Sequence, residues 1–203
     1  MTIYTGNALD QSSANEYSRL NFVVRQITGG MATSGLARVV AVDTTKMRVD
    51  VNPLVHQIDG TGKPTPHGVI HNLPYLRLQG GSGGVIIDPA VGDIGIVVYA
   101  STDISSVKNT RKPGGPGSRR RFSMADGLYL GGVLNAAPTS YILIDPAGNI
   151  TAHSPGRIVL NAPDVQTSGT LETAGTITVT GGDVVADGLS LKAIDARLRR
   201  IGG

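Results

Sequence analysis

Apolar residues recur along this chain with two periods, and the first is that of a helix. Within SSANEYSRLNFVVRQITGG, four apolar side chains fall at i, i+3, i+4 and i+7, namely Leu20, Val23, Val24 and Ile27. The spacing predicts a helix with its N-cap at Ser12 or Ser13, Glu16 near the capping-box position and an end at Gly29-Gly30. We interpret the apolar stripe either as a docking surface for a partner or as the face that packs on the chain's own domain.

The second period is two residues, which is typical of strands, and it extends from about residue 35 to residue 135. Around the turn DTTK, alternate positions place five apolar side chains on one predicted face: Val40, Val42, Met47, Val49 and Val51.

Three further segments add strands to this region. In LPYLRLQGG, three residues alternate with Leu76 and Leu78, which predicts one continuous strand. GGVIIDPAVGDIGIVVYA predicts a short strand, a proline turn and then a fully buried strand over IGIVVYA, and DGLYLGG predicts one more. Five or so short strands within about 100 residues favour a small closed barrel such as an OB-fold.

From Tyr141 onward, short modules end at turn residues and then repeat in units of six: DVQTSG, TLETAG and TITVTG. Apolar residues alternate with polar ones inside the modules, so they share one face of a strand. The predicted core positions are Ile142, Ile144, Ile158, Leu160, Val165, Leu171, Ile177 and Val179. The unit-ending glycines Gly169, Gly175 and Gly181 are predicted corners. Fixed short periods of this kind indicate a β-solenoid or a related stacked structure.

A single copy of this tail carries too little apolar surface to fold on itself. One or two aliphatic side chains per unit do not offset the conformational entropy lost when six residues are ordered. Six residues of strand span about 20 Å, which is too short to close a three-sided rung. Three chains wound around a common axis supply one side each and leave no open sheet edge. The sequence therefore predicts an intertwined homotrimer, and the alternative is a disordered Gly/Thr linker.

Composition narrows the possible classes of protein. Charged residues make up 16% of the chain, the net charge is +3 and glycine occurs 28 times, a combination typical of β structure with many turns. The absence of cysteine excludes a disulfide framework and a cysteine-ligated zinc site. No apolar run approaches the roughly 20 residues of a membrane span, and the N-terminus shows no secretory signal pattern. We expect a protein that is made in a cytoplasm and is soluble there.

Basic residues concentrate in the connector KNTRKPGGPGSRRRFSMADG, which Gly and Pro predict to be a loop. They are Lys108, Arg111, Lys112, Arg119, Arg120 and Arg121. We interpret them as contacts for an acidic patch on a neighbouring subunit, with phosphate contact as the alternative. Because aromatic residues for base stacking are thinly spread in the barrel region, no nucleic-acid partner is expected.

Motifs for catalysis or metal binding are weak. GTGKPT lacks the spacing of a phosphate loop and is predicted to be a turn. His67 and His71 have the spacing of zinc ligands on a helix, but Pro and Gly frame them, so with His56 they form a weak candidate. Three aspartates in turn-like contexts are predicted to bond their own backbone: Asp88, Asp93 and Asp103. No catalytic constellation is evident, so we expect no enzyme activity, cofactor or metal.

Three stretches, PAVGDIGIVVYASTDIS, RRRFSMADGLYLGG and GGDVVADGLSLK, resemble central spike proteins of contractile-tailed phages, the baseplate assembly protein V family. The resemblance covers the chain from about Gly35 to Lys192. It implies a homotrimer with an OB-fold collar at the baseplate hub and a triple-stranded β-helix that narrows to a point. It also implies a place in the virion below the tail tube, with tail hub and tube proteins as partners. Sheath contraction would push such a spike into the host envelope.

The C-terminal end departs from that family. In many such spikes a histidine-x-histidine motif follows, and three copies bind an iron ion at the apex. Here no histidine follows His153, so the resemblance implies no metal site. SLKAIDARLRRIGG instead places apolar residues at heptad a and d positions: Leu191, Ile194, Leu198 and Ile201. They predict a helical cap or a mount for a separate tip protein, and the alternative is a frayed terminus.

The patterns together predict an all-β chain in four parts. These are an N-terminal docking segment with a helix (1–34), an OB-fold-like barrel (35–135), an intertwined trimeric β-helix shaft (136–189) and a short C-terminal helix at the apex (190–203). The predicted function is a non-enzymatic central spike of a phage tail baseplate. The alternatives are the spike of a bacteriocin or type VI-like injection system and, in another class, a single-stranded nucleic-acid-binding OB-fold protein.

Overall fold

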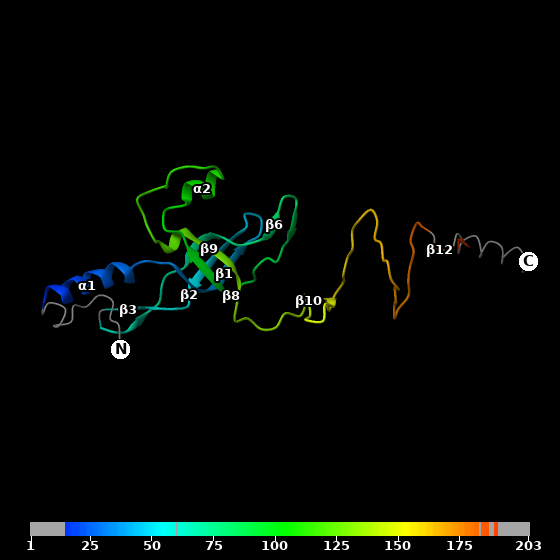
Figure 1. Cartoon of the computed structure of the whole chain (residues 1–203), viewed down its shortest axis with the longest axis horizontal. Coiled ribbons are helices and arrows are strands. Elements are labelled where there is room, and N and C mark those ends of the chain that lie inside the picture. The colour runs from blue at the N-terminus through cyan, green and yellow to red at the C-terminus, as the bar shows by residue number, and fades with distance from the viewer. Residues whose placement is uncertain (1–14, 60, 183, 187–188, 191–203) are drawn as a thin grey trace, which may run out of the picture. The chain divides into compact units, whose positions relative to one another are not determined.

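The computed structural model describes residues 15–59, 61–182, 184–186 and 189–190 of the chain. The chain divides into two compact units, of which the first ends at Pro138 and the second begins at Thr139. Strands account for most of the regular structure (Figure 1). The predicted apex positions lie outside the described residues: Leu191, Ile194, Leu198 and Ile201.

The predicted N-terminal helix is confirmed as α1, Glu16–Gly29. The predicted cap at Ser12 or Ser13 is wrong, because the Oδ1 of Asn15 accepts a hydrogen bond from the backbone N–H of Ser18 at 2.8 Å. Such a bond satisfies one of the free N–H groups of the first turn. The helix ends at the predicted Gly29-Gly30 pair, where the backbone N–H of Gly30 donates to the carbonyl oxygen of Ile27 at 3.3 Å and that of Met31 donates to the carbonyl oxygen of Thr28 at 3.2 Å.

The first unit is built around one curled, five-stranded antiparallel sheet that forms a half-barrel. The strand order is β5-β2-β1-β8-β9. Its strands are β1 (Ser34–Asp43), β2 (Arg48–Pro53), β5 (Ile70–Pro74), β8 (Ile94–Tyr99) and β9 (Gly127–Gly132). The curl brings the two edge strands together just past the end of β5, where Tyr75 forms a parallel bridge with Tyr129 and the N–H of Leu76 donates to the Tyr129 carbonyl at 2.7 Å.

The concave face of this sheet holds the core. Its buried apolar side chains are Ala37, Val39, Val49, Val51, Ile70, Leu73, Tyr75, Val97 and Tyr129. The predicted inward position of Val40 is wrong. The register against β2 shifts between Val39 and Ala41, so Val39 is buried whereas Val40 is 39% exposed. A bulge of this kind inserts an extra residue and changes which side chains face the core, while Val42 still packs against it.

Two other predicted strands differ from the structure. IGIVVYA is not buried on both faces, because in β8 Gly95 and Val97 are buried while Ile96 is 37% exposed. LPYLRLQGG is not one strand: β5 ends at Pro74, and β6 (Leu78–Gly80) pairs with β7 (Gly83–Val85) as a separate hairpin. The second difference follows from the sheet's curl, which ends β5 at the point where the chain meets β9.

The close approach of β8 and β9 requires a residue without a side chain at Gly95. A Cβ there would collide with the carbonyl oxygen of Gly131 and with the ring and hydroxyl of Tyr129. We expect Gly95→Ala to destabilise the protein by about 2 kcal/mol, because backbone and buried ring atoms leave little room to relax. The matched control is Gly35→Ala on the paired strand β1, where a Cβ meets no atom within 4 Å. Urea unfolding of both variants measures the difference, and equal stabilities would contradict the packing argument.

The loops of the first unit contain small elements. The predicted turn at GTGKPT is confirmed: it joins β3 (Gln57–Ile58) to β4 (Pro64–Thr65), and the Oδ1 of Asp59 accepts from the N–H groups of Thr61 and Lys63, each at 2.9 Å. The connector predicted as a loop begins within the last turn of helix α2 (Ser105–Thr110) and contains a 3₁₀ turn, η2 (Met124–Asp126), near its end.

The second unit forms little regular structure within one chain. β10 (Tyr141–Ile144) pairs with β11 (Ile150–His153), and β12 (Val185–Ala186) pairs with β13 (Leu189–Ser190). The described residues between His153 and Val185 form no strand. The strands predicted over Ile158–Leu160 and Ile177–Val179 therefore have no pairing partner within the described part of one copy, and the trimeric β-helix stays a prediction.

Candidate functional site

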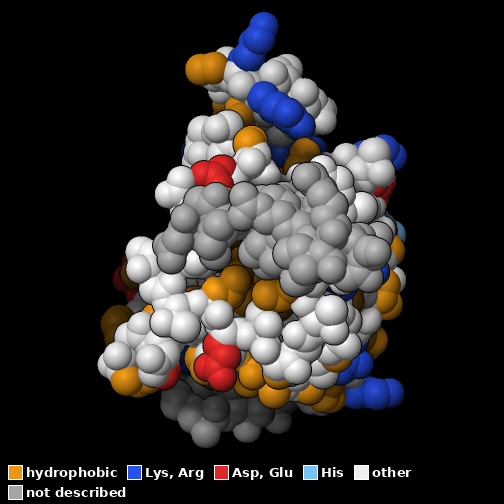
Figure 2. Space-filling model, turned by 90° about the vertical axis from the view of Figure 1, so that its right-hand side faces the viewer, with side chains coloured by type: hydrophobic (Ala, Val, Ile, Leu, Met, Phe, Trp, Pro, Cys, Tyr) orange, Lys and Arg blue, Asp and Glu red, His pale blue; other side chains and the backbone are white. Residues whose placement is uncertain are grey.

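The apolar side chains of the tail are exposed in a single copy. The predicted core positions are 46–73% exposed in a single copy: Ile142, Ile144, Ile158, Leu160, Val165, Leu171, Ile177 and Val179. No described side chain between Leu134 and Val185 is buried. Figure 2 shows hydrophobic side chains at many points of one face of the molecule, among polar ones. Exposed apolar sets of this extent mark surfaces that contact another molecule.

The backbone of the tail bends at a regular interval. Bends lie at residues 168–169, 174–175 and 180–182, so they coincide with Gly169, Gly175 and Gly181, the predicted corners. Gly181 has a φ of +78°, a conformation that residues with a Cβ rarely adopt. Each straight segment between bends presents one or two aliphatic side chains, so the exposed set is divided into evenly spaced groups.

The stripe on α1 is a second unpartnered apolar surface. No side chain of this helix is buried, and Leu20, Val23, Val24 and Ile27 are 62%, 49%, 48% and 58% exposed. A helix that packs on its own domain would bury this stripe, so the exposure disagrees with that interpretation. The geometry favours a docking surface, and its partner stays a prediction.

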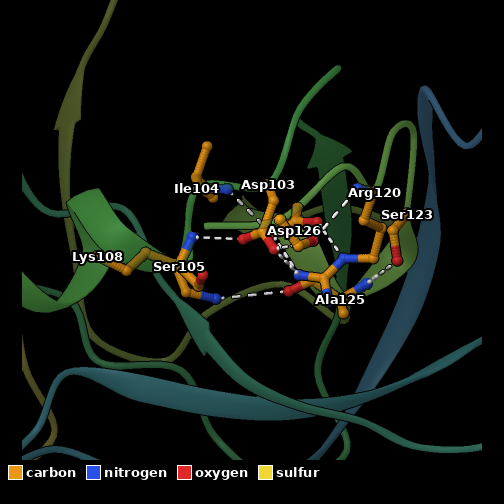
Figure 3. Close-up of polar contacts among 9 residues, drawn as sticks. Asp103, Ile104, Ser105, Lys108, Arg120, Ser123, Ala125 and Asp126 are labelled. Carbon is orange, nitrogen blue, oxygen red and sulfur yellow. Dashed lines mark hydrogen bonds and ion pairs between the residues drawn. The ribbon is translucent and has the colours of Figure 1, made fainter. Parts of the chain in front are cut away.

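A buried carboxylate pair anchors the connector beside the half-barrel (Figure 3). Asp126 is 1% exposed and Asp103 is 5% exposed. The guanidinium of Arg120 lies between them: its Nε donates to Asp126 at 2.8 Å, and its terminal nitrogen lies 3.2 Å from Asp103. Asp126 also accepts from the backbone N–H of Ile104 at 3.2 Å, and Asp103 accepts from the hydroxyl of Ser118 at 2.7 Å.

These contacts give Arg120 a role that the sequence interpretation missed. The connector arginines were predicted to meet an acidic patch on another subunit, but Arg120 binds two acids of its own chain. The backbone bonds of Asp103 confirm its predicted turn role, since its Oδ1 accepts from the N–H of Ser105 at 2.8 Å. No sequence pattern predicted the role of Asp126, because its partners Ile104 and Arg120 reach it only in the folded connector. The arrangement fixes the connector to the first unit.

Asp103 accepts hydrogen bonds from the hydroxyl of Ser105, from the hydroxyl of Ser118 and from the backbone N–H of Ser105. These bonds hold the pKa of Asp103 well below its usual value of 3.8. Because the folded pKa lies below the unfolded one, the stabilisation is present above about pH 4 and is lost as the pH falls toward the folded pKa. We expect Asp103→Asn to lower the melting temperature at pH 7, and the gap from the native chain to narrow below pH 4. Thermal melts at pH 7, 4 and 2.5 measure this gap, with the exposed-site variant Glu172→Gln as control. A gap that widens in acid would contradict the assignment.

A second polar cluster supports the seam between the sheet edges. The hydroxyl of Tyr75 donates to Asp88 at 2.5 Å, and Arg77 lies 2.7 Å from the same carboxylate oxygen with its guanidinium over the Tyr75 ring. The hydrogen bond from Tyr75 and the pairing with Arg77 lower the pKa of Asp88. The prediction that Asp88 bonds its own backbone is therefore wrong, whereas it is confirmed for Asp93, which accepts from the N–H of Ala90 at 2.8 Å.

The histidines do not form a metal site among the described residues. No group of three or more His, Asp, Glu or Cys side chains there is placed to hold a metal ion. His71 instead contacts the carboxylate of Asp50 at 2.6 Å, and His56 and His67 line an open hollow next to Tyr99.

No protein-family model matches the chain, and no curated protein matches it. Among the described residues, no helix is both long and apolar enough to cross a membrane.

Proposed function

We propose that this chain is the structural central spike of a contractile phage tail baseplate. It acts as a homotrimer that caps the tail tube and pierces the host cell envelope when the sheath contracts. The observation that carries this proposal is the tail: evenly spaced aliphatic side chains, exposed in one copy, on a backbone that bends every six residues.

Trimerisation explains both features of the tail. If three copies wind around an axis, each aliphatic position occurs three times in one layer, and the bends become the corners between faces. The strands that lack partners in one copy then pair with those of the neighbouring copies, so no edge stays open. Position by position, the proposed layers include Ile158 with Leu160, then Val165, Leu171, and Ile177 with Val179.

The first unit supports a collar role. The strand order of its curled half-barrel, together with the parallel approach of Tyr75 to Tyr129, supports the proposal of a five-stranded Greek-key barrel of the OB type. In the proposed assembly this barrel lies at the baseplate hub, and α1 presents its exposed stripe to a tail hub or tube protein. The C-terminal end is proposed to carry a helical cap or a separate tip protein.

The mechanism is mechanical rather than catalytic. Axial force on a shaft made of interlocked strands is shared by three chains, and no chain can peel away alone. The proposed location is the virion tail baseplate, after assembly in the host cytoplasm, and contact with the envelope is transient. The same geometry suits the spike of a related injection system such as a bacteriocin, and the particle with which the protein copurifies distinguishes the two.

Light scattering on the purified full chain tests the proposal. We expect a mass of three times 21.0 kDa and a band in unboiled SDS gels that disappears on boiling. A monomer of 21.0 kDa would overturn the spike. A monomer that binds single-stranded oligonucleotides in a salt-sensitive way would replace it with the nucleic-acid-binding alternative.

A further inference from the structure

A hollow on the first unit gathers positive charge from parts of the chain that are distant in sequence. Its volume is about 560 Å³, and it lies between the β1–β2 turn, the start of β2, β5 and helix α2. The residues that line it are Lys46, Arg48, Asn72, Lys108, Asn109 and Arg111. Every one of these side chains offers N–H donors, and no carboxylate is among them.

Three of the four cations that line the hollow take part in no ion pair of the described residues. Lys46 pairs with Asp43 at 3.4 Å, on an exposed turn. The ion pairs of the described chain do not include Arg48, Lys108 or Arg111. Neutral backbone carbonyls accept from two of these side chains instead: the Nζ of Lys108 donates to the carbonyl oxygen of Ala125 at 3.4 Å. Arg48 donates to the carbonyl oxygens of Asn72 at 3.2 Å and Lys108 at 3.5 Å, so the guanidinium keeps further donors free.

The crowding of these cations has an electrostatic cost. Burial lowers the pKa of Lys108, and the neighbouring positive charge of Arg48 lowers it further, while the carboxylates of Asp126 and Asp103 offset part of this shift. Like charges held together destabilise a fold unless an anion neutralises them. A bound anion at this hollow would reverse the unfavourable interaction.

The chemistry of the lining selects the kind of anion. Guanidinium and ammonium donors approach from β2 and α2, and the amides of Asn72 and Asn109 add neutral donors around them. A tetrahedral phosphate group presents several strong acceptors in different directions and carries more charge than a carboxylate. The hollow has no aromatic lining on which a base could stack, which disfavours single-stranded nucleic acid.

We propose that this hollow, defined by Arg48, Lys108 and Arg111, binds a phosphate group on a small molecule or a lipid headgroup. The site belongs to the first unit, so it does not depend on the role proposed for the tail.

Calorimetric titration of inorganic phosphate into the full chain, at low salt and in a cationic buffer, tests this site. We expect saturable binding that Lys108→Gln and Arg111→Gln each weaken about tenfold or more, because each removes a charge-assisted hydrogen bond. Lys112→Gln is the matched control: it removes the same charge from an exposed position next to Arg111, outside the hollow. We expect it to change the affinity less than about twofold. Melting curves show that each variant is folded.

Vesicles of phosphatidylcholine with and without phosphatidic acid identify the source of the phosphate. Stronger binding to phosphatidic acid vesicles than to inorganic phosphate, lost in Lys108→Gln, assigns a lipid headgroup, whereas equal affinity assigns a free phosphate. The proposal is overturned if phosphate shows no saturable binding to the folded native chain, or if Lys112→Gln weakens binding as much as Lys108→Gln. Competition by a single-stranded oligonucleotide that binds more tightly than either probe would also overturn it.

Discussion

Replacing Ile177 by aspartate is expected to break the assembled protein into single chains of 21.0 kDa. In one copy this side chain is 63% exposed, so a monomeric protein would tolerate the change with almost no loss of stability. In the proposed trimer, the substitution places three carboxylates around one axis inside an apolar layer. Each buried charge then costs several kcal/mol, and like charges repel one another across the axis. Light scattering and unboiled SDS gels measure the result.

The control for this experiment lies one residue away. Thr178→Asp adds the same charge between Ile177 and Val179, on the opposite face of the predicted strand. We expect this variant to keep the trimeric mass. If the native chain is trimeric, a trimer that survives Ile177→Asp would show that Ile177 is not in a buried layer. Dissociation of both variants would show that the two faces of this segment are not distinguished as proposed.

Sequence periodicity predicted the elements of the first unit more reliably than it predicted their faces. The apolar stripe at helical spacing correctly identified α1, and DGLYLGG correctly identified β9. Val40 was assigned to the wrong side of its strand, because a bulge near Val39 changes the alternation and leaves no mark in an apolar run. Periodicity describes a regular strand, and a curled sheet needs irregular ones.

The polar contacts were less predictable than the strands. Local turns at Asp93 and Asp103 follow from the ability of aspartate to bond the backbone next to it, and both are found. The partners of Asp88 and Asp126 depend on how distant segments meet: Asp88 contacts Tyr75 across the seam, and Asp126 contacts Ile104 across the connector. Such contacts carry no spacing rule, so composition and motif cannot reveal them.

The tail illustrates a different limit of a single chain. Its aliphatic spacing and glycine positions predicted the bends at Gly169, Gly175 and Gly181, which are local features. The pairing of its strands is expected between copies, and one copy leaves its aliphatic side chains in solvent. The sequence pattern and the structure thus identify the same aliphatic residues as available for assembly, and the Ile177→Asp variant tests whether three copies assemble through them.

The carboxylate pair in the connector leads to the second large expected effect. Replacing Arg120 by leucine removes the guanidinium and leaves Asp126, 1% exposed, without its ion-pair partner. Breaking a buried ion pair by removing one partner is strongly destabilising, because the remaining charge stays desolvated. We expect the melting temperature to fall by roughly 10 °C. The expected change would be larger if Arg120 were fully buried, but its side chain is partly exposed and solvent screens the ion pair.

Arg119→Leu and Arg121→Leu are the matched controls, because both arginines are exposed neighbours that take part in none of the ion pairs of the described chain. We expect each control to lie within about 2 °C of the native chain, since exposed substitutions outside such networks change stability little. Scanning calorimetry at pH 7 measures all three variants.

A second test uses Arg120→Lys, which restores one positive charge without the paired N–H groups that reach both acids. Its melting temperature should lie between those of Arg120→Leu and the native chain, because the charge offsets part of the desolvation while the fork geometry is lost. If Arg120→Leu melted with its two neighbours, the carboxylates would be held by Ile104 and the serines alone, and the guanidinium would be free for the intersubunit contact that the basic connector first indicated.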